Sequence, residues 1–216
     1  KRNVQGTLLS RAFNPFYWWK FIGGSAGRSE LAAELYDEIL FNGATFADLD
    51  RRGGPFIMAS ATDVSTGARL VYDQETFDVM CSSLDAFPLS RAAASSSAVP
   101  VVLSAITLNN YGGTCNYAPP SWLKLISGSA DLPPAAMRMQ REFDERLAFS
   151  DGAQRPYIHL VDGGVADNVG MRSLLTVLDL LESLHRAGVP TRLDSVRRIV
   201  VFVVNSVSSP RTDWDK

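Results

Sequence analysis

An apolar run that ends in an aspartate and two glycines, "YIHLVDGGVADNVG" at residues 157–170, constrains the fold of this chain most strongly. Ile158, Leu160 and Val161 are typical of a buried strand, and Asp162 follows them directly. Residues 168–188 then carry leucines along one stripe, at the spacing of an amphipathic helix. The stretch therefore predicts a strand that leads through a glycine turn into a helix.

Predicted strands and helices alternate along the rest of the chain. Helical signals mark residues 28–43, 74–84, 88–99, 133–149 and 168–188, and strand signals mark residues 56–62, 68–72, 101–108, 157–161 and 197–205. We expect Ser29 to cap the first of these helices. The last strand, "RRIVVFVVN", is rich in β-branched residues, which is typical of a central strand buried on both faces. This alternation predicts a single α/β domain over residues 1–216, with helices on both sides of a sheet.

Composition and charge exclude some function classes. The formal net charge of −2 gives no basic surface for nucleic acid. The chain has no run of about 18 apolar residues, as a membrane-spanning helix needs, and no zinc or EF-hand motif. We therefore expect no metal site. The chain starts at Lys1 without a signal-peptide pattern and stops at "TDWDK", so we interpret it as a fragment that is incomplete at both ends.

The chain contains two cysteines, Cys81 and Cys115, which could form a disulfide. They form no CxxC motif and no histidine lies near them in the sequence, which argues against a metal site. They are either two buried thiols or one disulfide, and a disulfide would indicate an oxidising compartment. The sequence does not decide between these alternatives.

The position of Asp162 suggests a chemical role. In open α/β sheets, ligands gather at the carboxyl ends of the strands, and Asp162 is predicted at such an end. Gly163 and Gly164 can adopt positive φ and can let a ligand or another backbone approach closely. A carboxylate held there can take a proton from a nucleophile or orient a neighbouring group. Alternatively, Asp162 caps the turn, although Asp167 and Asn168 directly precede the long helix and fit a capping role better.

Several stretches, in the same order, resemble the patatin-like phospholipase family. "VDGGVADNVG" resembles the family's Asp-Gly-Gly/Ala motif. "FPLSRAAASSSAVPVVLSAITL" at residues 87–108 is similar to the segment in which a small-residue helix runs through a Ser-Ala-Val-Pro step into a strand. "PFIMASATDVSTGARLVYD" at residues 55–73 is similar to the strand with an Ala-Thr-Asp sequence and a Thr-Gly turn. With "RNVQG", "GRSELAAELYDEILFNGATFADL" and the final "VVN" and "DWD", which look like a bacterial branch, the resemblance covers nearly the whole chain.

This resemblance implies a three-layer α/β/α sandwich that is incomplete, because its N-terminal strands lie outside the sequence. The family hydrolyses acyl esters of lipids with a Ser-Asp dyad, without a histidine and without a cofactor. Asp162 matches the dyad aspartate, which implies the role of general base, and Gly163 and Gly164 would keep the approach to it open. The implied partner is a lipid or phospholipid, met at least transiently at a membrane surface. A membrane-associated or periplasmic location in a bacterium fits the resemblance, whereas the lipid class and the oligomeric state stay open.

The family's serine lies in a G-x-S-x-G elbow, and this chain has one such sequence, "GGSAG", with Ser25 at its centre. A working elbow needs a helix that starts directly after the serine. The helix signals here start later, at Ser29, and no glycine-rich oxyanion loop precedes Ser25. We therefore expect Ser25 to be a loop residue and the nucleophile to lie upstream of Lys1. The fragment alone is then expected to be inactive.

Two other functions stay open at this point. A Ser-His-Asp triad would need a histidine beside Asp162, but His159 is expected on the opposite face of the same strand and His185 near the C-terminus of a helix. A non-catalytic lipid-binding or interaction domain could keep the fold without the nucleophile. The aromatic stretch from Phe13 to Phe21 is either a membrane contact or part of a packed core.

Other polar positions have simpler interpretations. Asp63 follows a predicted strand and could line the same cleft as Asp162, but a role in the turn is favoured. The serines at Ser95–Ser97 follow a small-residue helix and indicate close packing rather than catalysis. Arg197 and Arg198 precede the last apolar run and are expected to be solvated.

Overall fold

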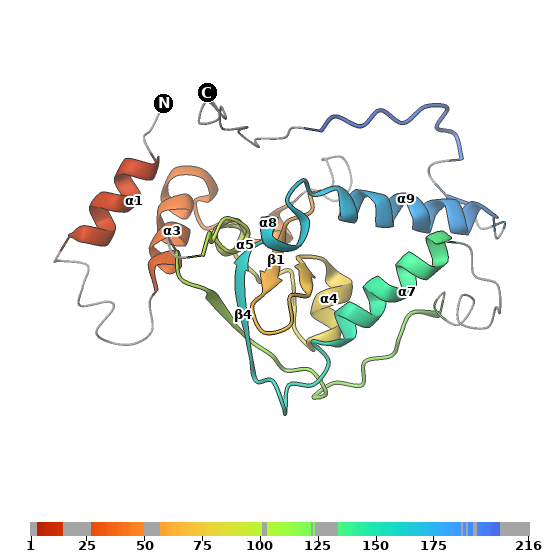
Figure 1. Cartoon of the computed structure of the whole chain (residues 1–216), viewed down its shortest axis with the longest axis horizontal. Helices are drawn as coiled ribbons and strands as arrows, with labels where there is room; N and C mark the ends of the chain where they lie inside the picture. The colour runs from red at the N-terminus through yellow and green to blue at the C-terminus, as the bar shows by residue number, and fades with distance from the viewer. Residues whose placement is uncertain are drawn as a thin grey trace, which may run out of the picture.

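The computed structural model describes residues 4–14, 27–49, 57–100, 103–121, 123, 134–186, 188, 190–191 and 194–203. Helices and strands alternate through this part of the chain (Figure 1). The helices are α1 (Val4–Phe13), α3 (Arg28–Tyr36), α4 (Gln74–Val79), α5 (Leu89–Ser96), α7 (Pro134–Leu147), α8 (Gly164–Asp167) and α9 (Met171–Arg186), with a π-helical turn η1 (Asp37–Phe41) and a 3-10 turn η2 (Phe46–Asp48). The strands are β1 (Ser60–Asp63), β2 (Arg69–Val71), β3 (Ile106–Asn109) and β4 (Tyr157–Asp162). This is a mixed α/β fold, which confirms the predicted class.

The described sheet is antiparallel, with the strand order β2-β1-β4-β3. The tight turn predicted between β1 and β2 is present: Gly67 has a φ of 72° and donates its N–H to the carbonyl of Asp63 at 2.8 Å. The rule that ligands gather at the carboxyl ends of strands assumes parallel strands, whose ends share one edge. Here β1 and β4 run in opposite directions, so this rule does not apply to them, and Asp63 pairs with Leu160, two residues before Asp162. Asp63 is fully buried and so does not line an open cleft, which agrees with the role in the turn that the sequence favoured.

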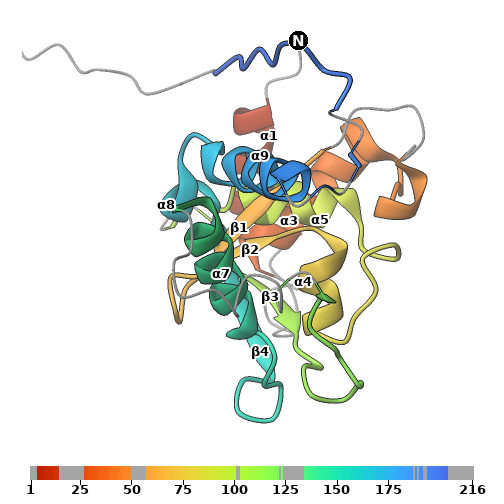
Figure 2. The same ribbon diagram turned by 90° about the vertical axis from the view of Figure 1, so that its right-hand side faces the viewer.

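Helices cover the sheet from two sides. On one side α5 contacts β1 and β4, and α3 packs on α5. On the other side α7 contacts β2 and packs on α9 (Figures 1 and 2). Leu70 in β2 belongs to the main core, whereas its neighbour Arg69 contacts side chains of α7 and α9, as expected for a strand covered on both faces. None of the described helices is long and apolar enough to cross a membrane.

An aromatic cluster fills the core beside α4. The ring of Tyr72 lies 5.3 Å from that of Phe87 and 6.2 Å from those of Phe46 and Phe77, measured between centroids. Each such pair contributes about 0.5–1.5 kcal/mol beyond the area that it buries. The four side chains come from η2, from the residue that follows β2, from α4 and from the segment before α5, so the cluster joins these parts of the chain.

The start of α3 differs from the prediction. Gly27 is its N-cap, so the expectation that Ser29 caps this helix is wrong. Ser29 is fully buried, and its hydroxyl donates to the carbonyl of Ser104 in the segment before β3. A buried hydroxyl needs a partner, and tertiary packing supplies one here that the local sequence does not show. The end agrees with the prediction: Asn42 and Gly43 follow η1 with positive φ values of 49° and 81°.

The C-terminal apolar run does not form the predicted central strand. Residues 194–203 belong to no strand, and Ile199, Val200 and Phe202 are 52%, 62% and 89% exposed. Figure 1 shows this segment passing α9 on the side away from the sheet. A strand buried on both faces needs a pairing neighbour and two covering layers, and in the described sheet the run pairs with neither edge strand, β2 nor β3. Residues 204 and 205 of the predicted strand lie outside the described part.

A disulfide joins Cys81 to Cys115, and this decides the question that the sequence left open. Their Cα atoms lie 5.6 Å apart, within the usual range for a disulfide. The bond connects the chain just after α4 to the loop that follows β3. It thus closes a loop over a sequence separation of 34 residues.

Candidate functional site

The stretch Asp162-Gly163-Gly164 follows β4 as the sequence predicted, but it leads first into the short helix α8, which the sequence did not predict, and only then into α9. The backbone of this stretch is held by the last residue of α5 and by the segment that follows it. The N–H of Asp162 donates to the carbonyl of Ala98 at 3.0 Å, and the N–H of Gly163 donates to the carbonyl of Ser96 at 3.2 Å. Two stretches that carry the family resemblance, far apart in the sequence, are therefore adjacent in the structure.

The carboxylate of Asp162 is half-buried and anchored at one oxygen. Its Oδ1 accepts the N–H of Gly164 at 2.7 Å. Within the described residues no hydroxyl donates to this carboxylate and no basic side chain pairs with it. A carboxylate with one oxygen fixed in this way can use its other oxygen to accept a proton from a group brought to it.

The two glycines of the turn are needed for space, not for positive φ. Gly163 has φ −61° and ψ −27°, and neither Gly163 nor Gly164 lies in the left-handed region. A Cβ on Gly163 would lie 2.3 Å from the carbonyl oxygen of Ser60, which is a fixed backbone atom. A Cβ on Gly164 would lie 3.0 Å from Oδ1 of Asp162 and 3.1 Å from Oδ1 of Asn168, which are the ends of side chains. The close approach that we expected is confirmed, and the approaching group is the protein's own strand β1.

We expect Gly163→Ala to lower the free energy of unfolding by about 1–3 kcal/mol, because its methyl group must displace the backbone of β1. Gly164→Ala is the matched control, since the side chains it meets can rotate away, and its cost should be clearly smaller. Urea denaturation of both variants measures the difference. Equal costs for the two would contradict the close approach between Gly163 and Ser60.

Two residues that the sequence analysis did not single out hold the chain just after Asp162. The hydroxyl of Thr62 in β1 donates to the carbonyl of Asp162 at 2.9 Å and accepts the N–H of Ala166 at 3.2 Å. Arg69 in β2 lies 3.8 Å from the carboxylate of Asp167, measured between Nη1 and Oδ2. A charged residue inside the apolar strand "ARLV" was the one signal that could have identified this contact.

Asp167 takes part in starting the long helix, as predicted. Its Oδ2 accepts the N–H of Arg172, in the first turn of α9, at 2.9 Å. Asn168 has helical backbone angles and ends α8 instead of capping α9. The capping expectation is therefore confirmed for Asp167 and wrong for Asn168.

No family model, no curated protein and no solved structure matches the chain. Functional inferences about this protein therefore depend on its own residues.

The histidines do not approach Asp162 in the structure. His159 is exposed on the opposite face of β4, where its Nδ1 lies 2.9 Å from the hydroxyl of Thr107. His185 is near the C-terminus of α9, as predicted, and its Nδ1 lies 3.1 Å from Oδ1 of Asp194. The N–H of Thr191 donates to the Asp194 carboxylate and, with the hydroxyl of the same threonine and His185, lowers its pKa below the ordinary value. Neither histidine is placed to form a triad with Asp162.

Asp63 has the role in the turn that the sequence favoured. It is fully buried, and its carboxylate accepts the hydroxyl of Thr66 at 2.5 Å. Its charge is compensated by Arg155, whose Nη2 lies 2.5 Å away. Thr66 and Arg155 both contact Oδ2, and Oδ1 accepts the N–H of Ser65 at 3.3 Å, so both carboxylate oxygens are engaged by the protein and this residue serves structure.

The serines at Ser95–Ser97 pack against their own helix, as expected. Ser95 is fully buried, donates to the carbonyl of Ala92 at 2.9 Å and hydrogen-bonds the hydroxyl of Tyr72. Burial raises the pKa of Tyr72 well above its ordinary value. Ser97 donates to the carbonyl of Ala93 at 2.9 Å. The hydroxyls of Ser95 and Ser97 are thus used in hydrogen bonds within the protein.

Other predicted positions can be placed only in part. Arg197 and Arg198 are exposed, as expected. Ser25 lies outside the described residues, so the structure does not position "GGSAG" relative to Asp162. Trp18, Trp19 and most of the aromatic stretch also lie outside them. Among the described side chains, no group of three or more His, Cys, Asp or Glu could hold a metal ion.

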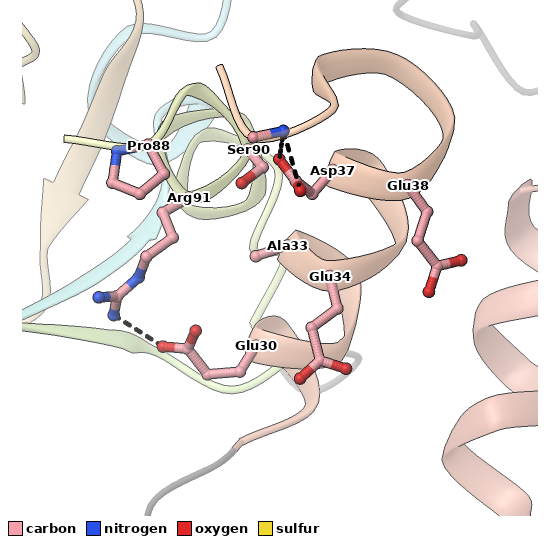
Figure 3. Close-up of a pocket in the computed structure, with 9 residues that line it drawn as sticks. Glu30, Ala33, Glu34, Asp37, Glu38, Pro88, Ser90 and Arg91 are labelled. Atoms are coloured by element: carbon pink, nitrogen blue, oxygen red, sulfur yellow. Dashed lines mark hydrogen bonds and ion pairs between the residues drawn. The ribbon is translucent and has the colours of Figure 1, made fainter. Parts of the chain in front are cut away.

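A separate groove lies between α3, η1 and the start of α5 (Figure 3). Its volume is about 480 Å³, and its lining is rich in carboxylates. Glu30 pairs with Arg91 at 2.7 Å, and Asp37 accepts the N–H of Gly43 at 3.0 Å, so part of this charge is already compensated. Asp162 does not line the groove, which is therefore distinct from the turn after β4.

Proposed function

We propose that this protein hydrolyses acyl esters of lipids through a Ser-Asp dyad in which Asp162 is the general base. One observation carries the proposal: a half-buried carboxylate at the end of β4, anchored at Oδ1 by the N–H of Gly164 and flanked by residues without side chains. The resemblance of the sequence to the patatin-like family supports this interpretation of the Asp-Gly-Gly turn. We further propose that the complete domain is the three-layer α/β/α sandwich of that family.

The chemistry that this geometry supports is acyl transfer in two steps. In the first, Asp162 accepts the proton of a serine hydroxyl while the serine oxygen attacks the carbonyl carbon of the ester. The proton then passes to the departing alcohol, which leaves an acyl-serine. In the second step water attacks the acyl-serine, Asp162 accepts a proton from that water, and the fatty acid is released as the serine regains its proton. Nothing in this sequence of steps needs a cofactor.

We propose that the serine and its oxyanion loop belong to a longer protein, upstream of this sequence, and that the 216 residues alone are inactive. The partner is then a lipid or phospholipid at a membrane surface. The aromatic stretch from Phe13 to Phe21 is our candidate for the contact with that surface.

A fluorophosphonate probe tests this proposal, because it forms a stable adduct with an activated serine. The 216-residue chain and the longer protein are treated in parallel, and the adduct is located by peptide mass. We expect an adduct on a serine outside these residues in the longer protein, and none on the folded 216-residue chain.

The other outcomes are equally clear. An adduct on Ser25 would keep the hydrolase proposal but would show that "GGSAG" is a working elbow. No adduct on either protein, with retained binding to phospholipid vesicles, would overturn the hydrolase proposal in favour of a non-catalytic lipid-binding domain.

A further inference from the structure

The backbone that follows Asp162 is held by two side chains from the neighbouring hairpin. Thr62 in β1 and Arg69 in β2 are direct partners in the antiparallel register, so both side chains project from the same face of the sheet. They are 2% and 5% exposed. Leu70, the next residue in β2, faces the main core instead.

Thr62 connects the two ends of the turn. Its hydroxyl donates to the carbonyl of Asp162 at 2.9 Å and accepts the N–H of Ala166 at 3.2 Å. One buried oxygen thus bridges the last residue of β4 and a residue of α8. The bridge restrains the orientation of α8 relative to β4, and α8 supplies the Gly164 N–H that anchors the Asp162 carboxylate at 2.7 Å.

Arg69 holds the far end of the same short helix. Its Nη1 contacts the hydroxyl of Ser173 and lies 3.8 Å from the carboxylate of Asp167, the last residue of α8. Its Nη2 pairs with Glu142 in α7. The Nε atom is buried and has no hydrogen-bond partner among the described residues. The guanidinium group therefore contacts side chains of α7, α8 and α9 and connects these three helices.

We propose that Thr62 and Arg69 are positioning residues that aim the Asp162 carboxylate by fixing α8 against the sheet. This inference rests on the proposed function of Asp162 as a base. Neither side chain touches the carboxylate itself, so both act through the backbone of α8. A reacting group displaced by about 1 Å can lose about 10²-fold in rate, which sets the size of effect to expect.

The test is Thr62→Val in the active protein, because valine keeps the shape of threonine and removes only the hydroxyl. We expect kcat for acyl-ester hydrolysis to fall by about 10²-fold while KM stays within about twofold, since substrate binding is not altered. Thr62→Ser, which restores the hydroxyl, should recover most of the rate. Thr107→Val is the matched control: it is the same substitution in the same sheet, at an exposed position in the edge strand β3, and should leave kcat unchanged.

Asp162→Asn is measured alongside, so that the two proposals can fail separately. If Asp162→Asn is inactive but Thr62→Val keeps its full kcat, the positioning role is overturned and the base assignment stands. If Thr62→Ser loses as much as Thr62→Val, the effect is one of packing, and the role of the hydroxyl is overturned. If Asp162→Asn is fully active, the proposed function fails, and the positioning role fails with it.

Discussion

Replacing Asp162 by asparagine in the active protein is expected to lower kcat for acyl-ester hydrolysis by about 10²–10⁴-fold, which is the usual contribution of a general base. The amide oxygen of asparagine can still accept the N–H of Gly164, which Asp162 accepts at 2.7 Å, so the turn should be preserved. The amide cannot take the serine proton at neutral pH. KM should therefore change little, and steady-state hydrolysis of a chromogenic ester would show the split.

His159→Ala and His185→Ala are the controls for the competing triad. Both side chains are exposed and neither contacts Asp162, so a Ser-Asp dyad should keep its rate in both variants. A Ser-His-Asp enzyme would lose several orders of magnitude when its histidine is replaced. A large loss in either histidine variant, or full activity in Asp162→Asn, would contradict the dyad.

Arg69→Met is expected to lower the free energy of unfolding by about 3–5 kcal/mol, the usual cost of removing one partner from a buried ion pair. The Arg69 side chain is 1% exposed, and its removal leaves Glu142 and Asp167, which are 16% and 6% exposed, without their shared cation. Methionine can fill part of the space, so the loss should come mainly from these uncompensated carboxylates.

Arg186→Met is the matched control for this substitution. Arg186 pairs with Glu182 one turn away on α9, but both side chains are more than half exposed. An exposed pair of this kind contributes about 0.3–0.5 kcal/mol. Urea denaturation of the two variants should therefore give clearly different midpoints. A loss for Arg69→Met as small as that for Arg186→Met would show that the buried cluster does not contribute as the structure indicates.

Much of the local structure was predictable from the sequence because it depends on neighbouring residues. The stripe of leucines predicted α9, the small residues predicted α5, and the turn with Gly67 predicted the β1–β2 hairpin. The same holds for the place of Asp162 at the end of a strand, directly before glycines and a helix. In each case the pattern of apolar and turn-forming residues within one segment decides how that segment folds.

The partners of each segment were decided only by the tertiary structure. Thr62 and Asp162 are 100 residues apart in the sequence, and nothing local indicates that they hydrogen-bond. Three other features are decided in the same way. They are the antiparallel direction of β1 relative to β4, the disulfide between Cys81 and Cys115, and the close approach of Gly163 to the carbonyl of Ser60. The apolar run at residues 197–203 shows the converse, because strand-forming residues make no strand where no neighbouring strand pairs with them. The hydrophobic periodicity of a segment indicates which of its sides is buried. Its pairing with other segments depends on distant backbone and side-chain groups, which the local sequence does not show.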